Sequence, residues 1–372
     1  MIAKPLTADL AQTWDQLLEN SDDGWVTSLA DWQTSICNLG PDSPEDKSFL
    51  VFHEGVAVAG FPLQHNRWQR ALFSTAVGYG GPFVSKAVDS SFRKKILAYA
   101  FEQVREIGKR CGCQTIEVSI CPVTQSSLAN KHAVNPLIYY GFEDTSTHAR
   151  ILDLSMSEDE LWGGLSAATR RNIKKARAAG YTVEKVTWEE HLATYQRIHE
   201  STYCRTGATP FTDVFHKAIQ RLAERGFSNL YAGFSPEGKV VAFHNTAVFG
   251  TSSRYWQGCC ESDQLTSNIN HLLFWSAIVA AKKNGGKQYL VGEIFHNCED
   301  QKLADIATFK SRFGGDMRRI FEGKLYLERP SPAEPSGREL LNQLVSIPAK
   351  LFRKGFRDIS GSAGVDRGLK NA

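Results

Sequence analysis

The chain repeats one order of predicted elements twice: a strand, a tight turn, two more strands, a helix and a final strand. Apolar residues alternate along the strand segments and recur every three to four residues along the helices. Both copies end in a helix, a glycine and a strand, within the sequences CGCQTIEV and NGGKQYLV. Because the copies lie about 175–183 residues apart, we interpret them as an internal duplication. The elements fall at 49–53, 56–63, 71–79, 91–110 and 114–120 in the first copy, and at 230–234, 240–249, 254–260, 270–283 and 288–291 in the second.

This order predicts an α/β (α+β) protein of two tandem units, each a mixed, largely antiparallel sheet flanked by helices. A length of 372 residues allows two to three domains of about 150 residues each. We place the first unit at residues 1–150, the second at 151–330 and a C-terminal helical tail at 331–372. Between the copies we expect helices at 157–165, 166–179, 188–205 and 212–225.

The composition is that of a globular protein, with 42% hydrophobic and 22% charged residues. No apolar run approaches the roughly 20 residues that span a bilayer, and the first residues lack the apolar core of a signal peptide. We therefore expect a cytoplasmic protein. The 43 basic and 40 acidic residues give a net charge of +3, which is too balanced to indicate a DNA-binding protein.

The 8 cysteines are too few for a disulfide scaffold, and no two are spaced as Cys-x-x-Cys. We expect reduced, buried thiols and no metal site. The alternative is a zinc site assembled from scattered ligands, for which the candidates are Cys111, Cys113, His296 and Cys298. A thiol nucleophile at Cys204, near His199, is a further alternative.

The densest positive charge lies on the predicted helix at 166–179, which carries five cations within two turns and no acid. Cations so close together repel one another, so they do not stabilise the helix. The face is either simply solvated or an anion-binding surface, and a phosphate-bearing acceptor suits it better than duplex DNA. The candidate substrate-binding residues on this helix are Arg170, Arg171 and Lys174.

Two further segments carry residues suited to acyl transfer. The apolar helix at 270–283 follows a run of capping residues, so its start is either an ordinary cap or a seat for a diphosphate or a carbonyl. Lys310 stands between Phe309 and Phe313, and it either presents a fixed charge to an oxyanion or interacts with the helix dipole. The candidate donor-binding residues are Ser267, Asn268 and Asn270.

Three segments together resemble the Fem-like branch of the GNAT acyltransferases: TRRNIKKARAAGYTVE, LLFWSAIVAAKKNGGKQYLVGE and FKSRFGGDMRRIFEGKLYL. Members of that branch resemble two GNAT units in tandem, and they include aminoacyl-tRNA-dependent transferases of cell-wall peptide bridges and acyltransferases of surface-sugar pathways. The resemblance covers about residues 20–330 and implies that Lys310 is the lysine of the family's FK motif, which is associated with the substrate or the transition state.

The chain departs from this family at two places. Residues 289–293 read Tyr-Leu-Val-Gly-Glu where relatives often carry a Tyr-Asp-hydrophobic-Gly pattern, so the usual aspartate is absent. The glycine-rich pyrophosphate loop of ordinary GNAT acetyltransferases is also missing. Three residues after Gln264, where that loop has a glycine, this chain has Ser267.

Residues and resemblance together predict an acyltransferase that moves an acyl group from acyl-CoA to an amine of a small, phosphate-bearing or sugar-linked acceptor. Attack is expected to be direct, without a covalent enzyme intermediate, and acyl-CoA to be a co-substrate rather than a permanently bound cofactor. Lys310 would stabilise the oxyanion and Glu293 would accept the amine proton. His244 and Tyr255 are weaker candidates for the base, and Tyr255 is also a candidate for substrate binding.

Two alternatives stay open at this point. One is an aminoacyl-tRNA-dependent transferase of cell-wall precursor synthesis, in which tRNA is a partner. The other is a non-catalytic binding protein on the same fold. The tail adds a possible contact with an anionic membrane surface, because apolar and basic residues share its predicted helix at 338–356.

Overall fold

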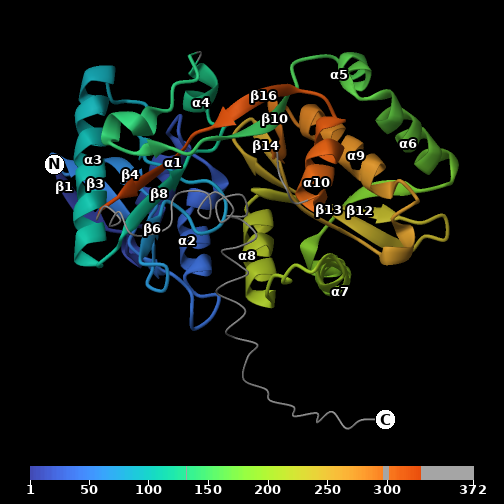
Figure 1. Cartoon of the computed structure of the whole chain (residues 1–372), viewed down its shortest axis with the longest axis horizontal. Helices are drawn as coiled ribbons and strands as arrows, with labels where there is room; N and C mark the ends of the chain where they lie inside the picture. The colour runs from blue at the N-terminus through green and yellow to red at the C-terminus, as the bar shows by residue number, and fades with distance from the viewer. Residues whose placement is uncertain (131, 296–300, 328–372) are drawn as a thin grey trace, which may run out of the picture.

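The computed structural model describes residues 1–130, 132–295 and 301–327, and it confirms the α/β (α+β) class with two units side by side (Figure 1). The first predicted hairpin is present as β3 (Phe49–His53) and β4 (Val56–Phe61), in antiparallel register. Its two turn residues, Glu54 and Gly55, both have positive φ, the backbone geometry that matches the twist of a two-residue hairpin. The predicted tail at 331–372, like His296 and Cys298, lies outside the described residues.

Elements of the two copies correspond one to one. In the first copy they are β3, β4, β6 (Ala71–Phe73), α3 (Ser90–Arg110) and β8 (Thr115–Ser119). In the second they are β12 (Ser228–Phe234), β13 (Val240–Phe249), β14 (Ser252–Cys260), α9 (Ile269–Lys283) and β15 (Gln288–Ile294). In each copy the third and last strands pair in parallel over three residues: Ala71–Phe73 with Thr115–Glu117, and Ser252–Arg254 with Gln288–Leu290.

The first unit differs from the second because its strands divide between two sheets. One predicted strand, 56–63, ends at Phe61 and continues in the other sheet at Gln64, since Pro62 has no N–H to donate to a neighbour. The smaller sheet has the order β1-β3-β4-β7, with β1 at Ile2–Pro5 and β7 at Phe83–Val84. The larger has the order β2-β5-β6-β8-β17-β9, with β2 at Glu45–Asp46, β5 at Gln64–Asn66, β17 at Glu322–Tyr326 and β9 at Glu143–Asp144.

The second unit has one continuous sheet of seven strands in the order β11-β12-β13-β14-β15-β10-β16. The three strands not predicted from the sequence are β11 (Thr182–Val186), β10 (Thr147–Asp153) and β16 (Asp316–Ile320). Helix α9 packs against β12 and β13 and is buried on several sides, as its apolar sequence predicts.

Helices between the copies lie where the sequence places them. They are α5 (Glu158–Gly164), α6 (Ala167–Ala178), α7 (Trp188–Thr206) and α8 (Asp213–Glu224). Ser157 begins α5 with a capping box to Glu160, and Ser166 caps α6 through the backbone N–H of Thr169. Three more helices are α1 (Ala11–Glu19), α2 (Ala30–Ile36) and α4 (Gln125–Ala129), and α10 (Gln301–Ser311) precedes β16.

Two long segments form an antiparallel ribbon that joins the sheets of both units. The first segment runs from β9 into β10, and the second runs from β16 into β17. β10 pairs with β16 in the second sheet, and β9 pairs with β17 in the first. Figure 1 shows β10 and β16 crossing together between the two units. The sheets therefore exchange strands: β10 begins before residue 150 but belongs to the second sheet, and β17 lies within the predicted second unit but belongs to the first sheet. The boundaries at residues 150 and 330 themselves stay a prediction.

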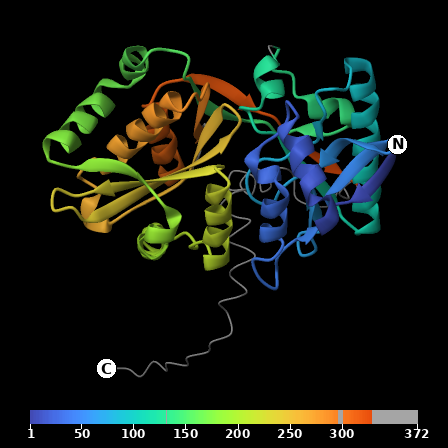
Figure 2. The ribbon, with the colours of Figure 1, turned by 180° about the vertical axis from the view of Figure 1, so that it is seen from behind.

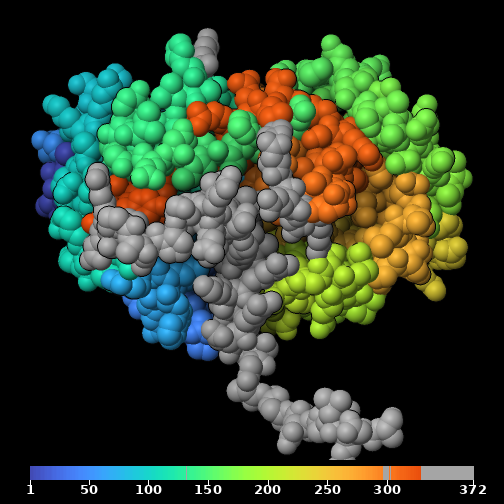
Figure 3. Space-filling model, in the orientation of Figure 1, coloured from blue at the N-terminus to red at the C-terminus, as the bar shows by residue number. Residues whose placement is uncertain are grey.

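A second contact between the units lies at the other side of the molecule, where α8 packs on α2 (Figure 2). Arg225, directly after α8, forms ion pairs of 2.7 Å with both Asp15 and Asp31 of the first unit. In the space-filling view of Figure 3 the red-orange atoms of 301–327 appear on both halves of the face shown. No helix of the described residues is both long and apolar enough to cross a membrane.

Candidate active site

The candidate site begins where β14 and β15 stop pairing. Their parallel register ends at Arg254 and Leu290, although β14 continues to Cys260 and β15 to Ile294. Backbone groups beyond this point have no partner across the two strands, which makes this a place where other groups can approach the sheet. Arg254, at the last paired position, and Glu293, three residues beyond Leu290, both lie at this divergence.

Glu293 is held by residues from both units. Its Oε1 accepts a hydrogen bond of 2.9 Å from the Tyr79 hydroxyl, and a terminal guanidinium nitrogen of Arg254 lies 3.8 Å from the same oxygen. The side chains of Glu293 and Arg254 are only 16% and 15% exposed. A carboxylate with two fixed partners in a part-buried position has a defined orientation, which is what a proton acceptor requires.

Lys310, in the last turn of α10, reaches the same strand. Its Nζ donates to the backbone carbonyl of Glu293 over 3.4 Å. Burial lowers the pKa of Lys310 to about 8, although the negative charge of Glu293 opposes this shift. The flanking Phe309 and Phe313 pack edge-to-face with ring centroids 5.3 Å apart, as their spacing predicts. The structure therefore brings Lys310 and Glu293 together, while their catalytic roles stay predictions.

Gly292 makes room for this lysine. Its φ is +136°, and a β-carbon placed there would lie 2.7 Å from Lys310 Nζ and 2.9 Å from its Cε. Both the backbone conformation and the nearness of Lys310 disfavour a larger side chain here. The register of β15 against β10 also shifts here, between Arg150 and Ile151. Gly292, the glycine of the Tyr-Leu-Val-Gly-Glu run, is thus the residue that admits the Lys310 side chain.

Tyr79 comes from a glycine-rich turn of the first unit, at residues 78–82. Thr27 Oγ1 fixes this turn by bonding both the N–H and the carbonyl of Tyr79, and Gly80 donates to the carbonyl of Ser119. The guanidinium of Arg254 lies 4.3 Å from the centre of the Tyr79 ring. Burial raises the pKa of Tyr79 well above its usual range, so its hydroxyl is a proton donor at neutral pH.

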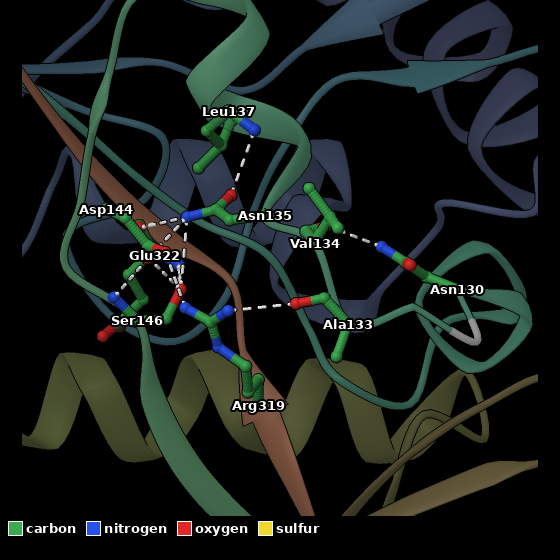
Figure 4. A network of polar contacts seen from close by, with 9 residues as sticks. All are labelled: Asn130, Ala133, Val134, Asn135, Leu137, Asp144, Ser146, Arg319 and Glu322. Carbon is green, nitrogen blue, oxygen red and sulfur yellow. Dashed lines mark hydrogen bonds and ion pairs between the residues drawn. The ribbon is translucent and has the colours of Figure 1, made fainter.

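Glu322 is a second part-buried carboxyl near this site. The hydroxyls of Ser119 and Thr147 donate to its two oxygens over 2.9 Å and 3.1 Å. Burial, reinforced by the negative charge of Glu293, raises the pKa of Glu322 to about 7. Figure 4 shows its backbone carbonyl accepting from Asn135, within a polar network at the ribbon that joins the units.

Sequence reasoning missed Tyr79, Arg254 and Glu322. The run Gly78 to Pro82 marks a turn, but nothing in the sequence indicates that it reaches the other unit. Arg254 stands in a predicted strand, and nothing in the residues of that strand indicates where its pairing with the neighbouring strand ends. Glu322 belongs to a strand that pairs with residues more than 200 positions earlier, as its 203-residue separation from Ser119 shows.

The predicted basic helix is α6, and its cations have different environments. Arg170 donates to the backbone carbonyls of Gly163 and Leu165, which satisfies the end of α5 and occupies its guanidinium. Arg171 and Lys174 are exposed and make no ion pair within the described part of the chain. The anion-binding prediction therefore depends on Arg171 and Lys174, whereas Arg170 has a structural partner.

The predicted donor-binding residues lie at the start of α9, where two of them stabilise the local turn. Ser267 Oγ donates to Gln264 and accepts from the N–H of Ile269. Asn268 has a φ of +66° and its side chain donates to the carbonyl of Thr266, so it does not cap the helix. Asn270 bonds the thiol of Cys260, whose pKa burial raises to about 11.

Two other candidates, Tyr255 and His244, lie in packed surroundings. The ring of Tyr255 packs, tilted, against both His244 and Phe274, with ring centroids 4.7 Å and 4.5 Å away. His244 is fully enclosed and its Nε2 lies 2.8 Å from the Tyr289 hydroxyl. Burial lowers the pKa of His244 to about 3, which makes it a weak base near pH 7, and its candidacy as the base stays a prediction.

The predicted alternative of a thiol nucleophile has no support in the structure. Cys204 is exposed on α7, whereas His199 is completely buried and neither of its ring nitrogens has a hydrogen-bond partner in the described residues. An activated thiol needs a base within hydrogen-bonding reach, and among the described residues no such base is seen beside Cys204. Within those same residues no group of three potential metal ligands occurs.

Comparison with known families identifies the second half of the chain. Residues 165–293 match the model of the acetyltransferase (GNAT) domain, a range that includes Arg254 and Glu293. The second unit is a GNAT acetyltransferase domain. This GNAT domain supports an acyltransferase enzyme, as the sequence predicts. No curated protein matches the chain.

Solved structures extend the likeness to the whole fold. The crystal structure of FemX is 16% identical, with a TM-score of 0.67, and the match covers 92% of this chain and 99% of that one. L-PGS from Bacillus licheniformis is 12% identical, with a TM-score of 0.59 and 95% and 99% covered. The C-terminal domain of a putative lysylphosphatidylglycerol synthetase from Agrobacterium fabrum is 14% identical, with a TM-score of 0.58 and 94% and 99% covered. The Fem-like, tandem GNAT fold of the sequence prediction is thus confirmed.

Proposed function

We propose that the GNAT domain transfers an acyl group from acyl-CoA to an amine at the point where Glu293, Lys310, Arg254 and Tyr79 meet. The observation that carries this proposal is the contact of Lys310 with the Glu293 backbone, beside a carboxylate that both units orient. A part-buried cation, a fixed carboxylate and a fixed phenol are three kinds of group that suit direct aminolysis of a thioester.

In the proposed reaction the amine nitrogen attacks the carbonyl carbon of the thioester, and Glu293 takes the proton that the nitrogen loses. The carbonyl oxygen becomes an oxyanion, which the charges of Lys310 and Arg254 stabilise. The intermediate then collapses, the carbon–sulfur bond breaks, and Tyr79 gives its proton to the leaving thiolate. Glu293 passes its proton to Tyr79 through the 2.9 Å hydrogen bond, which restores both groups.

A small, phosphate-bearing or sugar-linked molecule is the acceptor that we propose, because Arg171 and Lys174 offer unpaired positive charge on α6. Those same cations favour a second candidate, in which the donor is aminoacyl-tRNA and the basic face binds its backbone. In that case the leaving group is a ribose hydroxyl, and the roles of Glu293 and Lys310 are unchanged.

Calorimetric titration of the protein with acetyl-CoA tests the donor directly. Saturable binding of one molecule per chain supports acyl-CoA, and amines are then screened by the release of free thiol. Lys310→Ala should lower turnover by about 100-fold with little change in donor affinity. Lys283→Ala, at an exposed position of the last turn of α9, is the matched control and should behave as wild type.

The second candidate predicts a different result in the same experiments. No binding at millimolar acetyl-CoA, together with a gel shift of aminoacyl-tRNA that Lys174→Glu weakens, would replace acyl-CoA by aminoacyl-tRNA as the donor. Wild-type turnover in Lys310→Ala would refute the proposed mechanism with either donor. Binding of both the donor and an amine without any turnover would favour a non-catalytic binding protein.

A further inference from the structure

The first unit presents an exposed tryptophan at the tip of a hairpin. The residues Arg67, Trp68, Gln69 and Arg70 join β5 to β6. Trp68 is 67% exposed and is the one exposed tryptophan in the described part of the chain. The guanidinium carbon of Arg67 lies 5.2 Å from the centre of a Trp68 ring. A single exposed apolar residue is common on protein surfaces, and what distinguishes Trp68 is its surroundings.

The tip of this hairpin has a fixed backbone. The side-chain oxygen of Asn66 accepts hydrogen bonds of 3.0 Å and 3.1 Å from the N–H groups of Trp68 and Gln69. Arg70 has a φ of +49°, which is unfavourable for a residue other than glycine, and its Nε donates to the carbonyl of Gly112 over 3.2 Å. The exposed position of Trp68 is therefore built into a turn that is anchored just beyond the end of α3.

Positive charge surrounds this tryptophan. Arg67 and Arg70 stand on either side of it in the sequence, and Arg110 lies two residues before the glycine to which Arg70 bonds. All three arginines are exposed and form no ion pair within the residues that the structure describes. We call Trp68 with Arg67, Arg70 and Arg110 the hairpin patch.

The acids near the hairpin patch do not cancel these arginines. Glu106 and Glu45 each form an ion pair with a lysine, at 2.8 Å and 3.1 Å. Asp42 follows Pro41, whose carbonyl accepts from Arg67, and it makes no ion pair among the described residues. Three unpaired positive charges therefore stand against one unpaired negative charge, which leaves the hairpin patch complementary to an anionic surface.

The chain leaves the described part of the structure beside the hairpin patch. Leu327 donates to the carbonyl of Gln114 over 2.9 Å, and the Gln114 N–H donates to the carbonyl of Arg70 over 2.6 Å. Farther along, residues 350–357 read Lys-Leu-Phe-Arg-Lys-Gly-Phe-Arg, a run of cations and apolar residues without an acid. Residues 328–349 can span at most about 75 Å, so this run can reach a surface that the hairpin patch contacts. A second basic and apolar segment is thus tethered at the same edge.

A lipid surface suits both segments better than other anionic partners. A bilayer with anionic lipids offers phosphates to arginine and an apolar layer beneath them, and tryptophan is enriched at the boundary between the two. A nucleic acid would stack on Trp68 and bind the arginines, but it offers no apolar layer to the run at 350–357.

We infer that the hairpin patch is a docking site for an anionic lipid surface. The ring of Trp68 enters the headgroup region, and Arg67, Arg70 and Arg110 bind lipid phosphates. The hairpin patch adjoins the start of β8, whereas the candidate active site lies near the end of that strand. Docking is therefore independent of the proposed function and can be measured without a substrate.

Sedimentation of the full chain with lipid vesicles tests the docking site. Vesicles of phosphatidylcholine with phosphatidylglycerol are compared with vesicles of phosphatidylcholine alone, at low and at moderate salt. The wild type should bind only the anionic vesicles, and more weakly at moderate salt, because salt screens the charges. Trp68→Ala should lower the affinity by about 10-fold. Arg67→Gln with Arg110→Gln should lower it by about 5-fold for each charge removed.

Exposed residues outside the hairpin patch provide matched controls. Lys239→Gln with Lys283→Gln removes the same charge from the second unit, and Tyr139→Ala removes an aromatic side chain that is 76% exposed. Both control proteins should bind anionic vesicles as the wild type does. Thermal unfolding of each variant should match the wild type, because every substituted side chain is exposed.

Quenching of tryptophan emission by brominated lipid tests whether the Trp68 ring enters the bilayer. Emission of the wild type should fall on binding, and Trp68→Phe should still sediment with the vesicles but lose most of that quenching. The inference is overturned if Trp68→Ala binds anionic vesicles as tightly as the wild type, or if a control protein loses as much affinity as the matching patch variant. Failure of the wild type to bind anionic vesicles also overturns it, and a gel shift of tRNA that Trp68→Ala abolishes would then assign the hairpin patch to nucleic acid.

Discussion

Substitution of Gly292 by alanine should reduce catalysis by displacing Lys310. Ordinary contacts of a β-carbon lie at 3.4–4 Å, whereas the new methyl group would lie 2.7 Å from Lys310 Nζ and 2.9 Å from Cε. The ammonium must therefore move by at least several tenths of an ångström, and its 3.4 Å contact with the Glu293 carbonyl is lost. A misplacement of about 1 Å can cost about 100-fold in rate, so we expect a loss of 10- to 100-fold in kcat.

The same substitution carries a backbone cost that must be separated from this effect. Alanine at a φ of +136° is strained, at about 1–3 kcal/mol of folding free energy. Gly285→Ala is the matched control, because Gly285 also has a positive φ, of +81°, but open space around its added methyl. It should lose stability and keep full activity.

The assay is turnover at saturating donor and amine, beside thermal unfolding of each variant and a titration of Lys310 followed by its side-chain NMR signal. We expect Gly292→Ala alone to lower kcat and to move the Lys310 pKa from about 8 toward its ordinary value, as the side chain becomes more exposed. If Gly292→Ala keeps wild-type kcat and an unchanged Lys310 titration, the reasoning that this glycine positions the lysine is wrong.

Three further predictions follow from the same contacts. Because the oxyanion requires the charged form of Lys310, whose pKa is about 8, kcat should fall as pH rises through 8, and Lys310→Arg should move that fall to higher pH. Burial lowers the pKa of His199 to about 3 and that of His216 to about 4, so the unfolded chain binds more protons below pH 6.5. Stability should therefore be complete above pH 6.5 and decline toward pH 4, and His199→Phe should lessen that decline in thermal unfolding measured at pH 7.5 and 5. Arg225→Ala removes two part-exposed ion pairs and should cost about 1 kcal/mol in urea unfolding, with no change in m; an unchanged midpoint would show that the pairs contribute nothing.

Local patterns were sufficient to predict most elements of the fold. Alternation gives β13 at its observed bounds, and Ser166 and Gly180 mark both ends of α6, since caps depend only on neighbouring residues. Three of the strands that were missed, β10, β16 and β17, are stabilised by partners far away in the sequence. Their pattern is set by the exchange between units rather than by local alternation.

The same difference separates the predicted and the missed parts of the candidate site. Lys310 and Glu293 could be selected because each lies in a motif of its own unit. Tyr79 and Glu322 reach the site only through contacts between units, which no single segment encodes. Arg170 shows the opposite error, since its charge was visible in the sequence but its bond to the end of α5 was not.

The strand exchange also sets the order in which the sheets can form during synthesis of the polypeptide. β8 borders β17 in the first sheet, and 203 residues separate Ser119 from its partner Glu322. At about 5–20 residues per second, the nascent chain carries an unpaired β8 edge for roughly 10–40 s after that strand has been made. An open edge is a site for pairing with other chains, so the ribosome-bound intermediate needs protection by a chaperone or by early collapse of its own core. The first unit is translated first, but its larger sheet is completed only when β17 has been made.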